Sequence, residues 1–247
     1  MSIIELVLLF ILGWSLGVLV NLLADSLPVE RRLTAPVCDA CGNPIQLTRY
    51  FFCEPCGACG NATSARRWIV AWGLGLVFAS IPLWLPERLT NFLVILLITY
   101  FALVLVIDIE HRLILHPVSF TGVLLGAVVG FWIRGPLATL LGGAAGFGIM
   151  FVLYLFGELF ARVMAKRRGQ ELEEVALGFG DVNLAGVLGL MLGWPGIGIG
   201  LLLAILAGGL ISAGFLVTML VKKNYTAFTA LPYAPFLIFA ACILLFR

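Results

Sequence analysis

The chain has 247 residues, of which 62% are hydrophobic and only 11% charged, and its mean hydropathy is +1.12. One soluble core cannot bury this much apolar surface, so soluble enzymes and disordered regulators are excluded as descriptions of the whole chain. A formal net charge of +2 does not suggest a polyanionic partner, and we expect no nucleic-acid binding. The composition predicts a membrane protein in contact with the lipid bilayer.

Eight apolar segments are typical of membrane-spanning helices, because they are long and nearly free of charge. In chain order they are 3–23, 68–85, 89–107, 114–133, 136–161, 182–194, 196–221 and 231–246. We therefore predict an all-α polytopic bundle of about eight transmembrane helices. We expect three parts, namely a first span 1–23, a loop domain 24–67 and a seven-span membrane domain 68–247. The first span lacks the basic start of a cleaved signal peptide, so we expect it to be retained.

Basic residues predict the orientation, because Lys and Arg collect on the cytoplasmic side of a membrane. With eight spans, one side receives only Arg88, Arg134 and Arg247. The opposite side receives all the others, which are Arg31, Arg32, Arg49, Arg66, Arg67, Arg112, Arg162, Lys166, Arg167, Arg168, Lys222 and Lys223. This asymmetry places both termini outside and the loop 24–67 in the cytoplasm.

Four of the glycines in the fifth span, which are Gly142, Gly143, Gly146 and Gly148, form a pattern that superficially suggests a nucleotide-binding loop. Small residues inside a membrane span usually allow two helices to approach closely. We therefore interpret this glycine run as a helix-packing surface and not as a nucleotide site.

Five of the six cysteines lie in the loop 24–67, as Cys38-x2-Cys41 and Cys53-x2-Cys56-x2-Cys59. Thiols in a reducing compartment seldom pair, and two C-x-x-C pairs present four thiolates in the tetrahedral arrangement that suits Zn²⁺. The spacing leaves open whether Cys53 and Cys56 or Cys56 and Cys59 complete the site. A redox-active or simply reduced cluster is the alternative. Four thiolates leave no open position for a water, so we expect a structural zinc.

Two acidic residues stand at predicted helix ends on the cytoplasmic side. Asp108 follows the uncharged run 100–107, and Asp181 opens the sixth span. A carboxylate at membrane depth is energetically costly, so each of these residues is a candidate for a functional role. Taken singly, Asp181 could instead be a helix cap, and Asp108 could be an ion-pair partner of Arg112. Two carboxylates together suit peptide hydrolysis. One, ionised, takes the proton of a water while the other, protonated, polarises the carbonyl.

The helix dipoles predict how the two aspartates divide these roles. The C-terminal end of the third span disfavours ionisation of Asp108, whereas the N-terminal end of the sixth favours ionisation of Asp181. We therefore expect Asp181 to be the base and Asp108 the acid of a pair that titrates jointly. Gly178 and Gly180 are predicted to bind substrate, because they let an extended peptide backbone approach. Glu110 either tunes Asp108 or is an ordinary interfacial residue.

The chain resembles the type IV prepilin peptidases, which are membrane aspartic peptidases of the GxGD class. The segment 178–185 is similar to their G-x-G-D-x-K-L segment, and 107–114 is similar to their first aspartate motif. Gly17-x3-Asn21 and the segment 232–236 resemble signatures of their first and last spans. The likeness extends over nearly the whole chain. It departs at Asn183, where the family usually has a lysine.

This resemblance implies an endopeptidase with Asp108 and Asp181 as catalytic residues. Its substrates would be type IV prepilin or pseudopilin precursors, cut behind a short basic leader at the cytoplasmic face of the bacterial inner membrane. The resemblance also implies N-methylation of the new terminus with S-adenosylmethionine. The competing interpretation is a proton-coupled transporter in which the aspartates form a relay. Its expected pair of matched, broken spans is not evident in the sequence.

The resemblance also bears on the zinc ligands. In the family an arginine that opens the next span stands seven positions after the last ligand, and Arg66 stands seven positions after Cys59. This favours one ligand set, which is Cys38, Cys41, Cys56 and Cys59.

Overall fold

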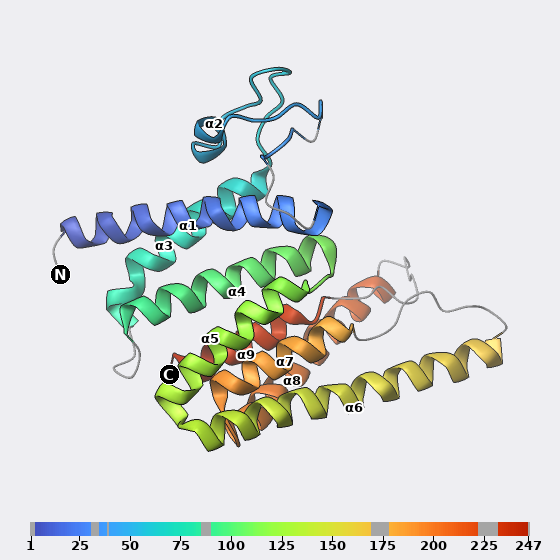
Figure 1. Cartoon of the computed structure of the whole chain (residues 1–247). Coiled ribbons are helices and arrows are strands. Elements are labelled where there is room, and N and C mark those ends of the chain that lie inside the picture. The colour runs from blue at the N-terminus through green and yellow to red at the C-terminus, as the bar shows by residue number, and fades with distance from the viewer. Residues whose placement is uncertain are drawn as a thin grey trace. The chain divides into compact units, whose positions relative to one another are not determined.

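The structure is a computed structural model that describes residues 3–30, 35–38, 40–84, 90–168, 178–221 and 232–246. These residues form the helices of Figure 1. They also form one isolated antiparallel bridge, between Val37 and Pro44. The helices are α1 (Ile3–Glu30), α2 (Leu47–Phe51), α3 (Ala65–Trp84), α4 (Asn91–His111), α5 (His116–Arg134), α6 (Pro136–Arg168), α7 (Phe179–Leu192), α8 (Gly196–Val221) and α9 (Ala234–Leu245). The chain divides into two compact units, Met1–His111 and Arg112–Arg247.

Six of the described helices, α1, α3, α4, α5, α6 and α8, are long and apolar enough to cross a membrane. The other two apolar helices, α7 and α9, are shorter. Each of the eight predicted spans coincides with one of these helices. The prediction of an all-α, multi-pass membrane protein is therefore confirmed.

The helix ends differ from the predicted span ends. α1 continues to Glu30, α4 to His111 and α6 to Arg168, because a helix persists wherever its backbone bonds are made, whereas hydropathy marks only where apolar residues stop. Some predicted positions lie outside the described residues. They are the span ends Leu85, Leu89 and Leu231 and the basic residues Arg31, Arg32, Arg88, Lys222, Lys223 and Arg247.

In the first unit, α1 packs along α3, and both contact α4. The close approach of α1 depends on glycine, since a Cβ on Gly17 would lie 2.7 Å from the Cα of Ala71. Beside this contact, the ring of Trp14 meets those of Trp68 and Trp72 edge to face at centroid distances of 6.0 and 5.4 Å. These contacts hold the middle of α1 against the first half of α3.

In the second unit, α7 is the central helix and contacts α5, α6, α8 and α9. Its apolar side chains are buried on every side, which explains why the segment shows no polar face. A Cβ on Gly142 of α6 would overlap the carbonyl oxygen of Gly189 of α7, and Gly146 approaches Ala185 in the same way. The predicted packing role of this glycine run is confirmed, although Gly148 faces open space.

Large apolar side chains cover the outer faces of the helices in both units. Ile69 of the first unit and Leu137 and Leu210 of the second are 70%, 73% and 75% exposed. Such surface is unfavourable in water and favourable against lipid tails. The helices therefore contact the bilayer.

Candidate functional site

The cysteine loop contains two turns of the same construction. Cys38 donates its backbone N–H to the carbonyl of Asn43 and accepts from the N–H of Gly42; Cys56 does the same with Asn61 and Gly60. Gly42 and Gly60 share a φ of +69°, which is the left-handed conformation that glycine adopts at little cost. The two turns have one sequence pattern, C-x-x-C-G-N. Its repetition is the signal in the sequence that distinguishes the second pair from Cys53.

The two turns bring four sulfur atoms together. The Sγ atoms of Cys38, Cys41, Cys56 and Cys59 all lie within 4.8 Å of one another. Cys38 to Cys59 is 3.7 Å and Cys41 to Cys56 is 3.8 Å. A tetrahedral zinc with bonds of about 2.3 Å requires sulfur atoms about 3.8 Å apart. These four thiols can therefore hold a metal ion such as zinc.

The backbone around Cys56 favours this role. Hydrogen bonds from the backbone N–H groups of Cys59 and Ala58 lower the pKa of the Cys56 thiol to about 6. A thiolate is the form that binds a metal. Cys53 lies outside the cluster, and burial raises the pKa of its thiol. The alternative pair of Cys53 and Cys56 is therefore not formed.

The two cysteine turns and α2 together form a cysteine module, which shares its apolar core with the membrane helices. Tyr50 of α2 and Ile45 pack with Cys38 and Cys56 against Val18 of α1. This small core is far below what an independent domain of that size needs. The module is held by its contacts with α1 and α3 and by any metal that the thiols bind.

Asp108 lies in the last turn of α4 and is buried, with 5% of its surface exposed. The helix ends three residues later, at His111, where its unpaired carbonyl groups carry a partial negative charge. The carboxyl group of Asp108 therefore lies near the negative end of the helix dipole.

Asp181 lies in the first turn of α7 and is also buried, with 9% exposed. Its Oδ2 accepts the backbone N–H of Gly178 at 3.2 Å, while its own N–H donates to the carbonyl of Gly178 at 3.1 Å. The carboxyl group of Asp181 therefore caps the start of α7 and lies near the positive end of the helix dipole. The phenol hydroxyl of Tyr233, just before α9, lies close enough to feel the charge of Asp181.

The two glycines beside Asp181 have different surroundings. A Cβ on Gly180 would lie 2.9 Å from the Cβ of Ile114, so this glycine is required by close packing. A Cβ on Gly178 would meet nothing nearer than Oδ2 of Asp181 at 3.6 Å. Their predicted role in binding substrate stays a prediction.

The structure thus brings together the four predicted metal ligands. Asp108 belongs to the first unit and Asp181 to the second, and their pairing stays a prediction. Sequence reasoning missed a polar network in the first unit that contains Asp25, Tyr50 and Arg66. No local motif marks it, because its members come from different helices.

Comparison with protein families matches residues 95–213 to the type IV leader peptidase family. The matched segment contains both Asp108 and Asp181. No curated protein and no solved structure matches the chain.

Proposed function

We propose that the chain is a membrane-embedded aspartic endopeptidase that removes the short basic leader of type IV prepilin or pseudopilin precursors, because residues 95–213 match the type IV leader peptidase family. The observation that carries the proposal is a buried carboxyl group at each of two helix ends within the matched segment. Asp108 lies in the last turn of α4 and Asp181 in the first turn of α7. Buried carboxyl groups are rare in membrane helices because they are energetically costly, and those that occur usually have a function.

In this proposal the two aspartates share one catalytic water. The carboxylate of Asp181 takes a proton from the water, whose oxygen attacks the scissile carbonyl carbon. Asp108, protonated, donates a hydrogen bond to the carbonyl oxygen and stabilises the negative charge that develops there. The tetrahedral intermediate then collapses, the C–N bond breaks, and the leaving amine receives a proton from the pair. The helix dipoles at the two sites support this division of roles.

The substrate class follows from where the aspartates stand. A pilin-like precursor has a polar, basic leader followed by an apolar helix, so its scissile bond rests at the membrane boundary. Asp108 and Asp181 stand at the polar ends of apolar helices. We propose that this end faces the cytoplasm of a bacterial inner membrane, as the distribution of basic residues predicts. The apolar part of the precursor would bind by packing against the helices, within the same lipid solvent.

The metal is proposed to be a structural zinc. Cys38, Cys41, Cys56 and Cys59 would hold it, and their sulfur spacing fits four-coordinate zinc. Such an ion supplies folding free energy and leaves no open coordination position. The residues that it orders are those of the loop and the start of α3.

The proposal extends to methylation of the new amino terminus with S-adenosylmethionine. Its support is the resemblance to prepilin peptidases. A cavity of about 20 Å³ between Glu54, Asn61 and Arg67 holds about one water and does not fit this methyl donor. We therefore assign no residue to methyl transfer and route no step through the donor.

The test of the proposed function is cleavage of a precursor. Purified protein in detergent is incubated with a pilin-like precursor that carries its leader, and both products are weighed by mass spectrometry. We expect a single cut at the junction of leader and apolar helix, with a further methyl group on the new terminus only when the methyl donor is added. A precursor that stays intact with every pilin-like substrate tried would contradict the proposal, and is what a proton-coupled transporter would give.

A further inference from the structure

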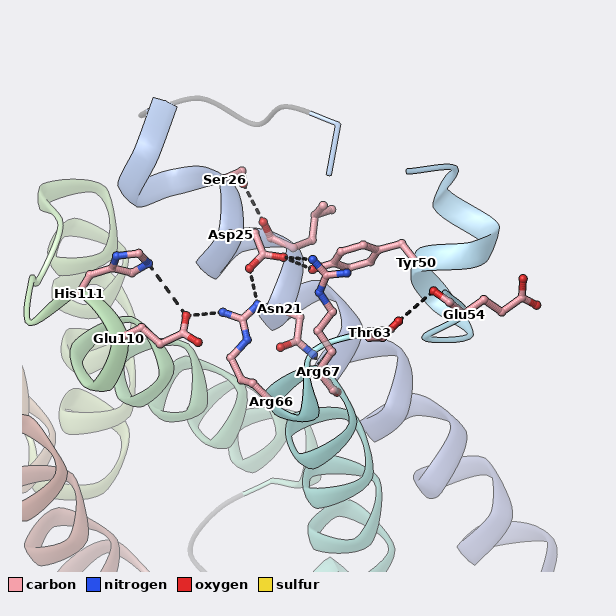
Figure 2. A network of polar contacts seen from close by, with 11 residues as sticks. Asn21, Asp25, Ser26, Tyr50, Glu54, Thr63, Arg66, Arg67, Glu110 and His111 are labelled. Carbon is pink, nitrogen blue, oxygen red and sulfur yellow. Dashed lines mark hydrogen bonds and ion pairs between the residues drawn. The ribbon is translucent and has the colours of Figure 1, made fainter. Parts of the chain in front are cut away.

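A polar network joins four helices of the first unit at the end that carries the cysteine module (Figure 2). Arg66, at the start of α3, donates to Asp25 of α1 through one guanidinium nitrogen and to Glu110 of α4 through another. Asp25 also accepts the hydroxyl of Tyr50 at 2.6 Å and Nη2 of Arg67 at 3.2 Å. Arg66 is therefore the residue that connects Glu110 to the rest of the network.

The charges of the network are balanced. Two guanidinium groups, those of Arg66 and Arg67, face the carboxylates of Asp25 and Glu110. The carboxylates of Asp25 and Glu110 flank the guanidinium group of Arg66, and an arginine side chain stays charged at ordinary pH. Its planar fork contacts two carboxylates at once, which the single ammonium of a lysine does less well.

The position of Arg66 depends on the cysteine module. Arg66 and Arg67 lie in the first turn of α3, and residues 62–65 connect them to the second cysteine turn. The guanidinium of Arg67 lies over the ring of Tyr50, 4.4 Å from its centroid, and Asn21 donates to the backbone carbonyl of Arg67 at 3.1 Å. The module thereby fixes the start of α3, and with it the direction in which Arg66 extends.

Arg66 bridges Asp25 and Glu110, and the Glu110 end of this bridge is close to Asp108 in the sequence. Glu110 stands two residues after Asp108, in the last turn of α4. The last turn of a helix lacks part of its backbone hydrogen bonding and opens more readily than the middle. Besides Arg66, Glu110 has His111 Nε2 at 4.0 Å. The contact with Arg66 therefore ties this turn to α1 and α3.

We propose that Arg66 is a positioning residue for Asp108: by bridging Asp25 and Glu110, it holds the last turn of α4 and thereby the acid of the proposed pair. The inference rests on the proposed function. It gives the cysteine module a part in catalysis, since the module orders the residue that fixes Asp108. No atom of the module or of Arg66 needs to touch the substrate.

The experiment compares variants of the full-length protein in detergent. Arg66→Gln removes the bridging charge, Arg66→Lys keeps the charge but not the fork, and Glu110→Ala removes the acceptor without touching the module. Arg162→Gln is the matched control, because Arg162 pairs with Glu158 one turn away on α6 and its side chain is 74% exposed. Each variant is measured for kcat and KM with a precursor, for bound zinc, and for hydrogen exchange of residues 108–113.

We expect Arg66→Gln and Glu110→Ala to lower kcat by about 10- to 100-fold with little change in KM, because a small misplacement of a catalytic group has effects of this size. The double variant should be no slower than either single one, since both changes break the same bridge. Arg66→Lys should fall between these variants and the wild type. Hydrogen exchange of residues 108–113 should become faster in the variants that lose kcat. Arg162→Gln should change neither kcat, KM, bound zinc nor the exchange rates.

The result that would overturn the inference is a bridge variant that keeps its zinc and also keeps the kcat and the exchange rates of Arg162→Gln. If Arg66→Gln loses zinc, Glu110→Ala decides the matter, because it leaves the module intact. If the wild type cuts no precursor, the proposed function fails. Hydrogen exchange then decides about the bridge alone, since unchanged exchange in Glu110→Ala refutes it and faster exchange supports it.

Discussion

Cys53 and Cys59 lie three residues on either side of Cys56, and their conformations assign them different roles. Cys59 follows the second C-x-x-C-G-N turn, and its sulfur lies 3.7 Å from that of Cys38. Cys53 is buried beyond the end of α2 and has a φ of +53°. Spacing alone could not separate them, because backbone conformation decides where each sulfur points.

The first prediction concerns these two cysteines. Cys59→Ser removes one of four thiolates, so we expect the purified protein to lose its bound zinc and to melt at a lower temperature. Cys53→Ser, the matched control, should keep one zinc per chain. Elemental analysis of both proteins checks this. Zinc retained in Cys59→Ser and lost in Cys53→Ser would show that the ligand set is wrong.

Tyr50 anchors the cysteine module to α1 through its hydroxyl group. Burial and the neighbouring Asp25 raise the pKa of Tyr50 well above its ordinary value of about 10. The hydroxyl group of Tyr50 therefore keeps its proton in the folded protein at a pH where the unfolded chain releases it. The stabilisation due to Tyr50 is therefore fully present below about pH 10 and is lost as the pH rises further.

The second prediction follows from this sign. Tyr50→Phe should lower the free energy of unfolding by about 1.5–3 kcal/mol near neutral pH, the usual value of a hydrogen bond to a charged group. The difference between the variant and the wild type should narrow above about pH 10. Melting temperatures measured across this pH range check the prediction. The prediction is contradicted if the difference in melting temperature stays constant up to about pH 11, which is about one unit above the ordinary pKa of tyrosine.

At the scale of the elements, the contact between α6 and α7 depends on backbone approaching backbone. Gly142 lies against Gly189 so closely that a methyl group on either would meet the other's carbonyl group. Because α7 carries Asp181 at its start, displacement of α7 would move that carboxylate. The glycine pattern therefore supports the site as well as the fold.

The third prediction uses two glycines of the same helix. Gly142→Ala should destabilise the protein by about 1–3 kcal/mol, the usual cost of overpacking, and should slow cleavage. Gly148→Ala should be tolerated, because nothing lies within 4 Å of the position where its methyl group would be. Thermal melting in detergent distinguishes the two. Equal melting temperatures would mean that α6 and α7 are not in contact here.

The identity of the elements could be predicted from the sequence, but their ends could not. The apolar runs identified the six long and two shorter apolar helices of the described residues, because hydrocarbon contact imposes a length and a composition on each span. α1, however, continues past Leu23 as far as Glu30 and carries Asp25 into the network of Arg66. Such an extension depends on partners elsewhere in the fold, which hydropathy does not record.

At the scale of the whole molecule, the same contrast separates the metal cluster from the polar network. The cluster could be predicted because its ligands come from two short, repeated motifs. The bridge through Arg66 could not, since it joins residues 41 and 44 positions apart without a motif. Asp108 and Asp181 were recognisable singly as charges at apolar helix ends. That they act together is the central proposal.

The most direct test of that proposal replaces each aspartate by its neutral isostere. Asp108→Asn, Asp181→Asn and the control Glu158→Gln are purified, checked for an unchanged melting temperature, and assayed for cleavage of the same precursor. Asparagine can neither accept the water's proton nor donate one. Each aspartate variant should therefore cleave at least about a thousandfold more slowly than the wild type, while the control keeps the wild-type rate. A folded Asp108→Asn or Asp181→Asn protein that cleaves as fast as the wild type would contradict the account.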